Sequence, residues 1–119
     1  MAKILIIDDS AVARKVLRDI FEKRRHQVLE AANGTEGIRQ YYAHKPDLVT
    51  MDILMPDMSG IEVVRRILSM DPGARIIMVT GSGKEDKVID SITSGARGFI
   101  LKPFDENKVA LEVEKVLKV

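Results

Sequence analysis

The sequence predicts an open α/β sandwich in which helices cover both faces of a parallel, five-stranded sheet. Short runs rich in β-branched residues alternate with longer amphipathic stretches, and the alternation repeats five times along the 119 residues. Each strand–helix unit therefore has about 24 residues, which suits such a unit. Turn-forming residues mark the boundaries, at Asn33-Gly34, Pro46, Met58-Ser59-Gly60, Asp71-Pro72-Gly73 and Ser94-Gly95.

Five mainly apolar runs are the predicted strands. They span residues 3–7, 27–31, 47–51, 75–79 and 98–101. The first, third and fourth are apolar at nearly every position, as expected of parallel strands covered on both faces. The second is more mixed, which suits a strand at the edge of the sheet.

The segments between the predicted strands have the period of helices. In the first segment, apolar residues recur at spacings of three and four, at Val12, Val16, Leu17, Ile20 and Phe21. The basic run Lys23-Arg24-Arg25-His26 closes this predicted helix, where the helix dipole favours cations. We therefore do not interpret the run as a nucleic-acid site.

The composition narrows the class of protein. The net charge is +1, with 19 basic and 18 acidic residues in short mixed groups, so charge alone does not indicate a polyanion-binding surface. The absence of cysteine excludes disulfide scaffolds, thiolate zinc sites and cysteine nucleophiles. No apolar run approaches the length of a membrane span, and no signal peptide is apparent. We expect one domain over residues 1–119, located in the cytoplasm and not inserted in a membrane.

Polar residues follow four of the five predicted strands. Asp8-Asp9 follow the first strand, Asp52 the third, Thr80 the fourth and Lys102 the fifth. Ligands of open α/β sheets bind at the carboxyl ends of the strands, so these side chains are expected to converge there. Three clustered carboxylates repel one another unless a cation offsets their charge. An oxygen-only set of ligands favours Mg²⁺ over Ca²⁺.

The predicted cluster is suited to phosphoryl transfer. A carboxylate in a metal-binding pocket is a competent nucleophile toward a phosphoryl group. Mg²⁺ and the Lys102 ammonium would stabilise charge on the phosphoryl oxygens, and Thr80 fits as a hydroxyl donor to one of them.

The residues at the strand ends resemble the receiver domain of two-component response regulators. The resemblance extends to the run that contains Asp52, Met51-Asp52-Ile53-Leu54-Met55-Pro56-Asp57-Met58-Ser59-Gly60. Thr80-Gly81 and Lys102-Pro103-Phe104 complete the pattern. The resemblance covers essentially the whole chain and is strongest to stand-alone chemotaxis regulators of the CheY type. It implies a flavodoxin-like (βα)5 fold with strand order 2-1-3-4-5.

The resemblance also implies a role for each site residue. Asp52 would accept a phosphoryl group from the phosphohistidine of a sensor histidine kinase. Asp9, Asp52 and the Leu54 backbone carbonyl would bind Mg²⁺, with Asp8 acting mainly through water. Lys102 would pair with the phosphoryl group, and its bond to Pro103 is cis in the family.

The resemblance further implies a conformational switch. After transfer, Thr80 would move toward the phosphoryl group and Phe99 would turn from an outward to an inward rotamer. The output surface would be the fourth helix, fifth strand and fifth helix, about residues 84–118. It would bind a protein target, the flagellar motor or another effector, and not nucleic acid. We expect a monomer that can dimerise on phosphorylation.

Three residues depart from enteric chemotaxis regulators. Leu54 and Ser82 stand where those proteins carry an amide and an acid, and Phe99 stands where they carry tyrosine. Leu54 cannot hydrogen-bond a hydrolytic water, which predicts a longer-lived phosphorylated state. Phe99 has no hydroxyl to offer a partner, which weakens the chemotaxis assignment but not the receiver assignment.

Two alternatives remain open. The chain could be the receiver fragment of a larger DNA-binding regulator or of a hybrid kinase. More remotely, it could be a phosphatase with an aspartate nucleophile. Phosphatases of the haloacid-dehalogenase type have a second acid two residues after the nucleophile, where Leu54 stands here. We therefore expect self-catalysed phosphoryl transfer and autodephosphorylation only, with no turnover of an external substrate.

Overall fold

The computed structural model describes residues 1–81 and 95–118. The strands are β1 (Lys3–Ile7), β2 (Gln27–Ala31), β3 (Leu48–Asp52), β4 (Ile76–Thr80) and β5 (Gly98–Leu101). The helices are α1 (Ala11–Lys23), α2 (Gly34–His44), α3 (Gly60–Met70) and α5 (Glu106–Leu117). The fourth helix expected from the sequence lies outside the described residues.

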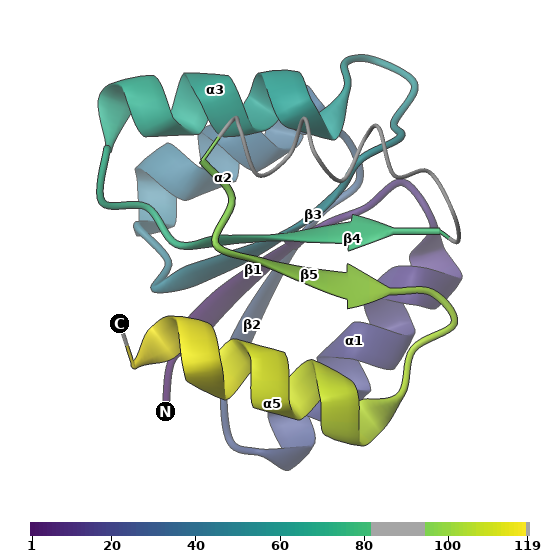
Figure 1. The fold of residues 1–119 in the computed structure, drawn as a ribbon. Coiled ribbons are helices and arrows are strands. Elements are labelled where there is room, and N and C mark those ends of the chain that lie inside the picture. Colours follow the sequence, from purple (N-terminus) through teal and green to yellow (C-terminus); the bar gives the residue numbers. More distant parts are fainter. Residues whose placement is uncertain (82–94, 119) are drawn as a thin grey trace.

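All five strands are parallel, and their order is β2-β1-β3-β4-β5. Figure 1 shows α2 and α3 on one face of the sheet and α1 and α5 on the other. The strands point the same way, so their carboxyl ends form one edge of the sheet. The predicted doubly wound α/β fold and its strand order are both confirmed.

Each face of the sheet has its own apolar core. Along β1, Ile4 and Ile6 pack with residues of α1 and α5, whereas Leu5 and Ile7 pack with residues of α2 and α3. This alternation follows from the two-residue period of a strand. All four of these β1 side chains are at most 1% exposed, which is why the strand is apolar throughout.

Each helix in the described ranges begins after a polar N-cap side chain. The cap residue accepts a hydrogen bond from a backbone N–H in the first turn of its helix, and the four are Ser10, Asn33, Ser59 and Asp105. All four caps lie on loops that leave the carboxyl edge of the sheet. The caps therefore help to define the loops that carry the predicted site.

Two strands differ by one residue from the sequence prediction. β3 and β4 span 48–52 and 76–80, not 47–51 and 75–79. Asp52 lies opposite Val79, and Thr80 lies opposite Leu101 in the ladder, because backbone pairing does not require an apolar side chain. Asp52 and Thr80 are thus the last residues of their strands, not the first residues of loops.

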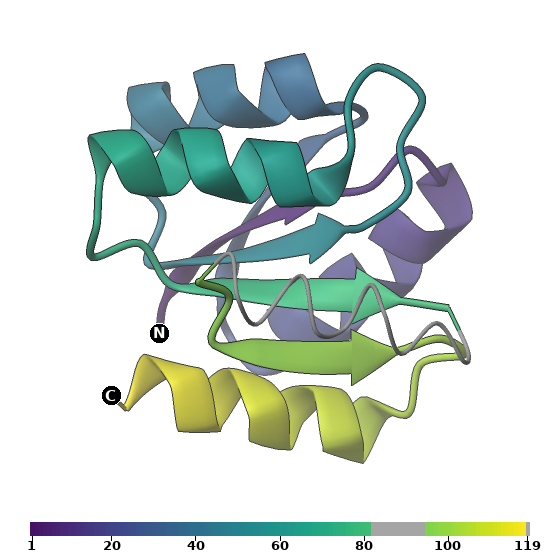
Figure 2. The same cartoon turned by 45° about the horizontal axis from the view of Figure 1, so that its top comes forward.

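The view in Figure 2 shows that the N-terminus and the end of α5 both lie at the amino end of the sheet, away from the carboxyl ends of the strands.

Among residues 1–81 and 95–118, no helix combines the length and apolar character needed to cross a membrane.

Candidate functional site

Three carboxylates meet at the carboxyl edge of the sheet. Each of Asp8, Asp9 and Asp52 has an oxygen within 4.8 Å of the others. They converge because β1 and β3 are neighbours, with Ile7 paired to Met51, so the next residue of each strand lies side by side. Asp8 is 1% and Asp52 7% exposed, whereas Asp9 faces solvent. The structure therefore brings together the three carboxylates that the sequence predicted to converge.

Lys102 reaches the same cluster from the loop after β5. Its Nζ lies 3.3 Å from Asp8 Oδ2 and 4.0 Å from Asp52 Oδ1. The Lys102 backbone N–H donates to the carbonyl oxygen of Thr80 at 2.9 Å, which holds the base of this loop against β4. The Lys102–Pro103 bond is cis, as the resemblance to receiver domains implied.

Thr80 ends β4, the strand between β3 and β5, and is 5% exposed. Its hydroxyl donates to the carbonyl oxygen of Gly81 at 2.9 Å. This is a local bond within the strand end. The hydroxyl therefore lies at the carboxyl edge of the sheet and bonds to the next residue of its own chain.

The electrostatics of the cluster depend on burial and on like charge. The pKa of the Asp52 carboxyl is raised from 3.8 to about 7, first by burial and then by the neighbouring Asp8 carboxylate. The Lys102 ammonium and the Leu54 backbone N–H act in the opposite direction on the same pKa, and Asp9 adds to the rise. The Lys102 ammonium therefore does not offset the effects that raise the Asp52 pKa.

The residues of the cluster fit a hard divalent cation. Asp8 Oδ2 is buried and accepts no hydrogen bond within the described residues, although it forms the ion pair with Lys102. This buried carboxylate oxygen, which has an ion pair but no hydrogen bond, is available as a ligand atom for a cation. Among residues 1–81 and 95–118, the ionisable ligand groups that meet at this place are carboxylates, and this donor set suits Mg²⁺ or Ca²⁺. Leu54 follows in the loop after Asp52, with its side chain 58% exposed.

A glycine keeps the loop after Asp52 close to α3. Gly60 donates its backbone N–H to the carbonyl oxygen of Ile53 at 2.8 Å. A Cβ at Gly60 would overlap the Asp52 carbonyl oxygen and lie 2.9 Å from Ile53 Cα. The sequence analysis treated Gly60 only as part of a turn. Its contact with the backbone of Asp52 depends on packing that no local pattern reveals.

The tip of the same loop is held by Asp57. Asp57 Oδ1 accepts from the Gly34 N–H at 3.0 Å, and Oδ2 accepts from the N–H and hydroxyl of Thr35 at 3.0 and 2.9 Å. These donors at the start of α2 lower the pKa of the Asp57 carboxyl to about 2. Asp57 therefore connects the loop to α2, which the sequence analysis did not foresee.

Phe99 lies on β5, half-buried and packed against the core on the α2 and α3 face. Its backbone N–H donates to Glu112 Oε2 of α5 at 2.8 Å. β5 and α5 are the described parts of the predicted output surface; Ser82 and the fourth helix lie outside the described residues. Leu101 and Leu111 expose apolar side chains on these two elements, at 62% and 66%.

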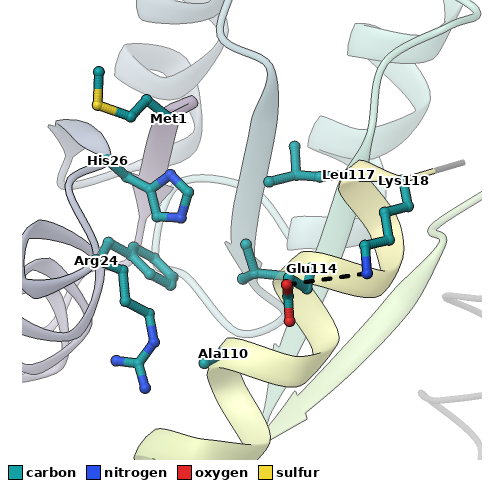
Figure 3. Close-up of a pocket in the computed structure, with 9 residues that line it drawn as sticks. Met1, Arg24, His26, Ala110, Glu114, Leu117 and Lys118 are labelled. Atoms are coloured by element: carbon teal, nitrogen blue, oxygen red, sulfur yellow. Dashed lines mark ion pairs between the residues drawn. The ribbon is translucent and has the colours of Figure 1, made fainter.

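A cavity of about 490 Å³ lies far from this cluster, between the ends of α1 and α5 (Figure 3). Two of the residues that line the cavity, Lys118 and Glu114, form an ion pair with each other. A third, Arg24, forms an ion pair with Glu106, which does not line the cavity. His26 accepts a hydrogen bond from the Ala2 N–H, and burial lowers the pKa of its imidazole. The charged groups are already paired, and none of the predicted site residues lines this cavity.

Comparison with known proteins identifies the family. Residues 4–114 match the response regulator receiver domain. The chain is 44% identical over 117 residues to the chemotaxis protein CheY of Thermotoga maritima, covering 98% of each chain. It is 45% identical over 116 residues to CheY of Bacillus subtilis, covering 97% of each. A receiver domain protein of Clostridium thermocellum superposes with a TM-score of 0.93 at 29% identity, over 99% of this chain and 95% of that one. The chain therefore belongs to the response regulator receiver domain family.

Proposed function

We propose that the protein is a phosphorylation-operated signalling switch of the cytoplasm, in which Asp52 accepts a phosphoryl group from a sensor histidine kinase. The observation that carries this proposal is the position of Asp52, buried at a strand end beside two further carboxylates and 4.0 Å from the Lys102 ammonium. A carboxylate held at a partly open, charged strand edge is suited to nucleophilic attack on phosphorus.

In the proposed transfer, an Asp52 carboxylate oxygen forms the new bond to phosphorus. The bond from phosphorus to the kinase imidazole breaks, and the imidazole nitrogen keeps that electron pair. Mg²⁺ bound by Asp9, Asp52 and the Leu54 carbonyl, and by Asp8 mainly through water, would supply positive charge next to the phosphoryl oxygens. Lys102 already lies within ion-pair distance of Asp52 and would pair with the phosphoryl group.

The phosphoryl group would then change the contacts of the strand ends. The Thr80 hydroxyl, now bonded to the Gly81 carbonyl, would donate to a phosphoryl oxygen instead. β5 is paired directly with β4, so movement at Thr80 would reach Phe99, whose ring is half-buried. The new charge acts as a ligand that favours one of two arrangements.

The output is proposed to be the binding of a protein target by β5, α5 and the fourth helix. The exposed Leu101 and Leu111 support such a surface. Two relatives of nearly the same length are chemotaxis proteins, so chemotaxis is the favoured circuit, with the flagellar motor or another effector as target. Phe99 in place of tyrosine indicates that the target contact differs from that of the enteric proteins.

The proposal is tested by phosphorylation with acetyl phosphate and Mg²⁺. We expect one phosphoryl group retained per wild-type chain, none in Asp52→Asn, and loss of labelling in the presence of EDTA. Asp57→Asn is the matched control, because it makes the same change at an exposed residue five positions further along the chain, and it should still be labelled. Continuous release of phosphate would instead indicate the phosphatase alternative. Labelling of Asp52→Asn would move the acceptor to Asp8 or Asp9.

A further inference from the structure

The backbone carbonyl of Asp8 is held by a side chain and not by the sheet. The Asp8 N–H donates to the Ala31 carbonyl of β2 at 3.1 Å, and Asp8 Oδ1 accepts from the Ser10 N–H at 2.9 Å. The Asp8 carbonyl oxygen accepts from Arg14 Nη1 of α1 at 2.7 Å. At 2.7 Å this is the shortest of the three bonds, as expected for a charged donor.

The orientation of that carbonyl determines where the Asp9 side chain starts. The peptide bond between Asp8 and Asp9 is planar, so the Asp8 oxygen and the Asp9 nitrogen move together. Asp9 itself is exposed, unlike the buried Asp8. An anchor on the Asp8 carbonyl therefore also restricts the Asp9 carboxylate.

Glu30 of β2 holds Arg14 in this position. Arg14 Nε lies 3.0 Å from Glu30 Oε1, while Arg18 Nε lies 2.6 Å from Glu30 Oε2. The Arg14 side chain is 17% exposed and the Glu30 side chain 31%. A planar guanidinium that bonds a carboxylate through one nitrogen and a carbonyl through another has little freedom to turn.

We propose that Arg14, oriented by Glu30, is a positioning residue that keeps Asp8 and Asp9 in the geometry required to bind Mg²⁺. The inference rests on the proposed function, since it assumes that the carboxylate cluster binds this ion. Arg14 acts through the Asp8 backbone, at the opposite end of the residue from its free carboxylate oxygen Oδ2.

Positioning and simple charge predict opposite effects of removing Arg14. Arg14 is a cation next to a proposed cation site, so by Coulomb repulsion alone its neutralisation would tighten Mg²⁺ binding. If Arg14 positions the carboxylates, its loss weakens binding, as loss of a residue that orients metal ligands typically does. The direction of the change in Mg²⁺ affinity therefore separates the two roles.

The experiment measures the Mg²⁺ dissociation constant by isothermal titration calorimetry at one pH and ionic strength. We expect Arg14→Gln to weaken binding about tenfold and Glu30→Gln about threefold. Arg18→Gln is the matched control, because Arg18 also bonds Glu30 and has no bond to Asp8. It should stay within about twofold of the wild type, because the ligands keep their anchor.

A second measurement reports the anchor itself without any metal. Amide hydrogen exchange at Ser10, which donates to Asp8 Oδ1, should become faster in Arg14→Gln and stay unchanged in Arg18→Gln. Arg14→Lys keeps the charge but cannot reach Glu30 and the Asp8 carbonyl together, so it should also bind Mg²⁺ weakly.

Unchanged or tighter Mg²⁺ binding by Arg14→Gln, or an equal loss in Arg18→Gln, would overturn the inference. Circular dichroism verifies the fold of each variant. If Arg14→Gln is unfolded, the Mg²⁺ dissociation constants of Glu30→Gln and Arg18→Gln are compared instead. A wild-type chain that binds no Mg²⁺ contradicts the proposed function itself. Wild-type binding with no effect at Arg14 and Glu30 contradicts only the positioning role.

Discussion

The base and the tip of the loop between β3 and α3 each carry an aspartate, and the two have opposite properties. Burial and the Asp8 charge raise the pKa of Asp52 at the base to about 7. Hydrogen bonds from Gly34 and Thr35 lower the pKa of Asp57 at the tip to about 2. The surroundings of Asp52 thus disfavour its charged form, whereas those of Asp57, five positions further along the chain, favour it.

The two aspartates are expected to affect the stability of the fold in opposite ways. The buried Asp52 has like charges nearby and few donors, so in the absence of a cation its charge destabilises the fold. Asp57 satisfies the free N–H groups at the start of α2 and holds the loop in place. The proposed phospho-acceptor thus has an unfavourable charge, and the favourable contacts of Asp57 lie only five positions further along the chain.

The largest expected effect concerns the base of the loop. Because the Asp52 pKa is raised on folding, the native state holds a proton that the unfolded state has lost between about pH 4 and pH 7. In EDTA, wild-type stability should therefore fall as the pH rises through this range, by up to about 4 kcal/mol. Asp52→Asn should lack this fall and be the more stable protein at pH 8.

Urea unfolding at pH 4 to 8, with and without Mg²⁺, measures this effect. Saturating Mg²⁺ should remove much of the difference between wild type and Asp52→Asn, because only the carboxylate gains from the ion. Parallel pH profiles for the two proteins in EDTA would contradict the raised pKa of Asp52.

The close packing of Gly60 against the base is expected to have the next largest effect. A Cβ here would overlap the Asp52 carbonyl, so Gly60→Ala should destabilise the protein by about 2 to 3 kcal/mol and slow phosphorylation. Gly73→Ala is the control, because the nearest atom to its Cβ would be Asp71 Oδ1 at 3.6 Å. Equal stability of the two variants, measured by urea unfolding, would show that the loop gives way freely.

The tip of the loop should show a smaller effect with the opposite pH dependence. The Asp57 pKa is lowered from 3.8 to about 2, so its contribution to stability is complete above about pH 4 and is lost as the pH falls toward 2. Asp57→Asn should be less stable than wild type at pH 6, with the difference shrinking by pH 2.5. Thermal unfolding at the two values measures this, and a constant difference would contradict it.

Much of the fold was predictable because its signals are local or periodic. The apolar alternation and turn residues gave five strands in approximately the right places, and the parallel arrangement then implied that Asp8, Asp52 and Lys102 would meet. The one-residue error at β3 has a physical cause. Asp52 continues the backbone ladder although its side chain is polar. A prediction from hydropathy therefore places the end of the strand one residue too early.

What the sequence could not reveal depends on side-chain contacts between distant segments. Asp57 and Gly34 are 23 residues apart, and Arg14 and Glu30 are 16 apart. The spacing of Arg14 and Arg18, four residues apart on a predicted helix, placed both on one face, and Glu30 made the second strand unusually polar. These two features together could have suggested the ion pairs, but not the bond from Arg14 to the Asp8 carbonyl.

Leu54 lies between Asp52 and Asp57, and its side chain is expected to affect the lifetime of the phosphorylated state. The Leu54 side chain is 58% exposed and cannot orient a water molecule for attack on a phosphorylated Asp52. Leu54→Asn should speed dephosphorylation about threefold to tenfold, a change of about 1 kcal/mol in the barrier, with little change in stability. Loss of labelled phosphate in the presence of Mg²⁺ measures the rate, with Leu111→Asn on α5 as an equally exposed control. If the rate does not rise, Leu54 does not limit access of water, and the lifetime of the phosphorylated state is set by other groups at the base of the loop.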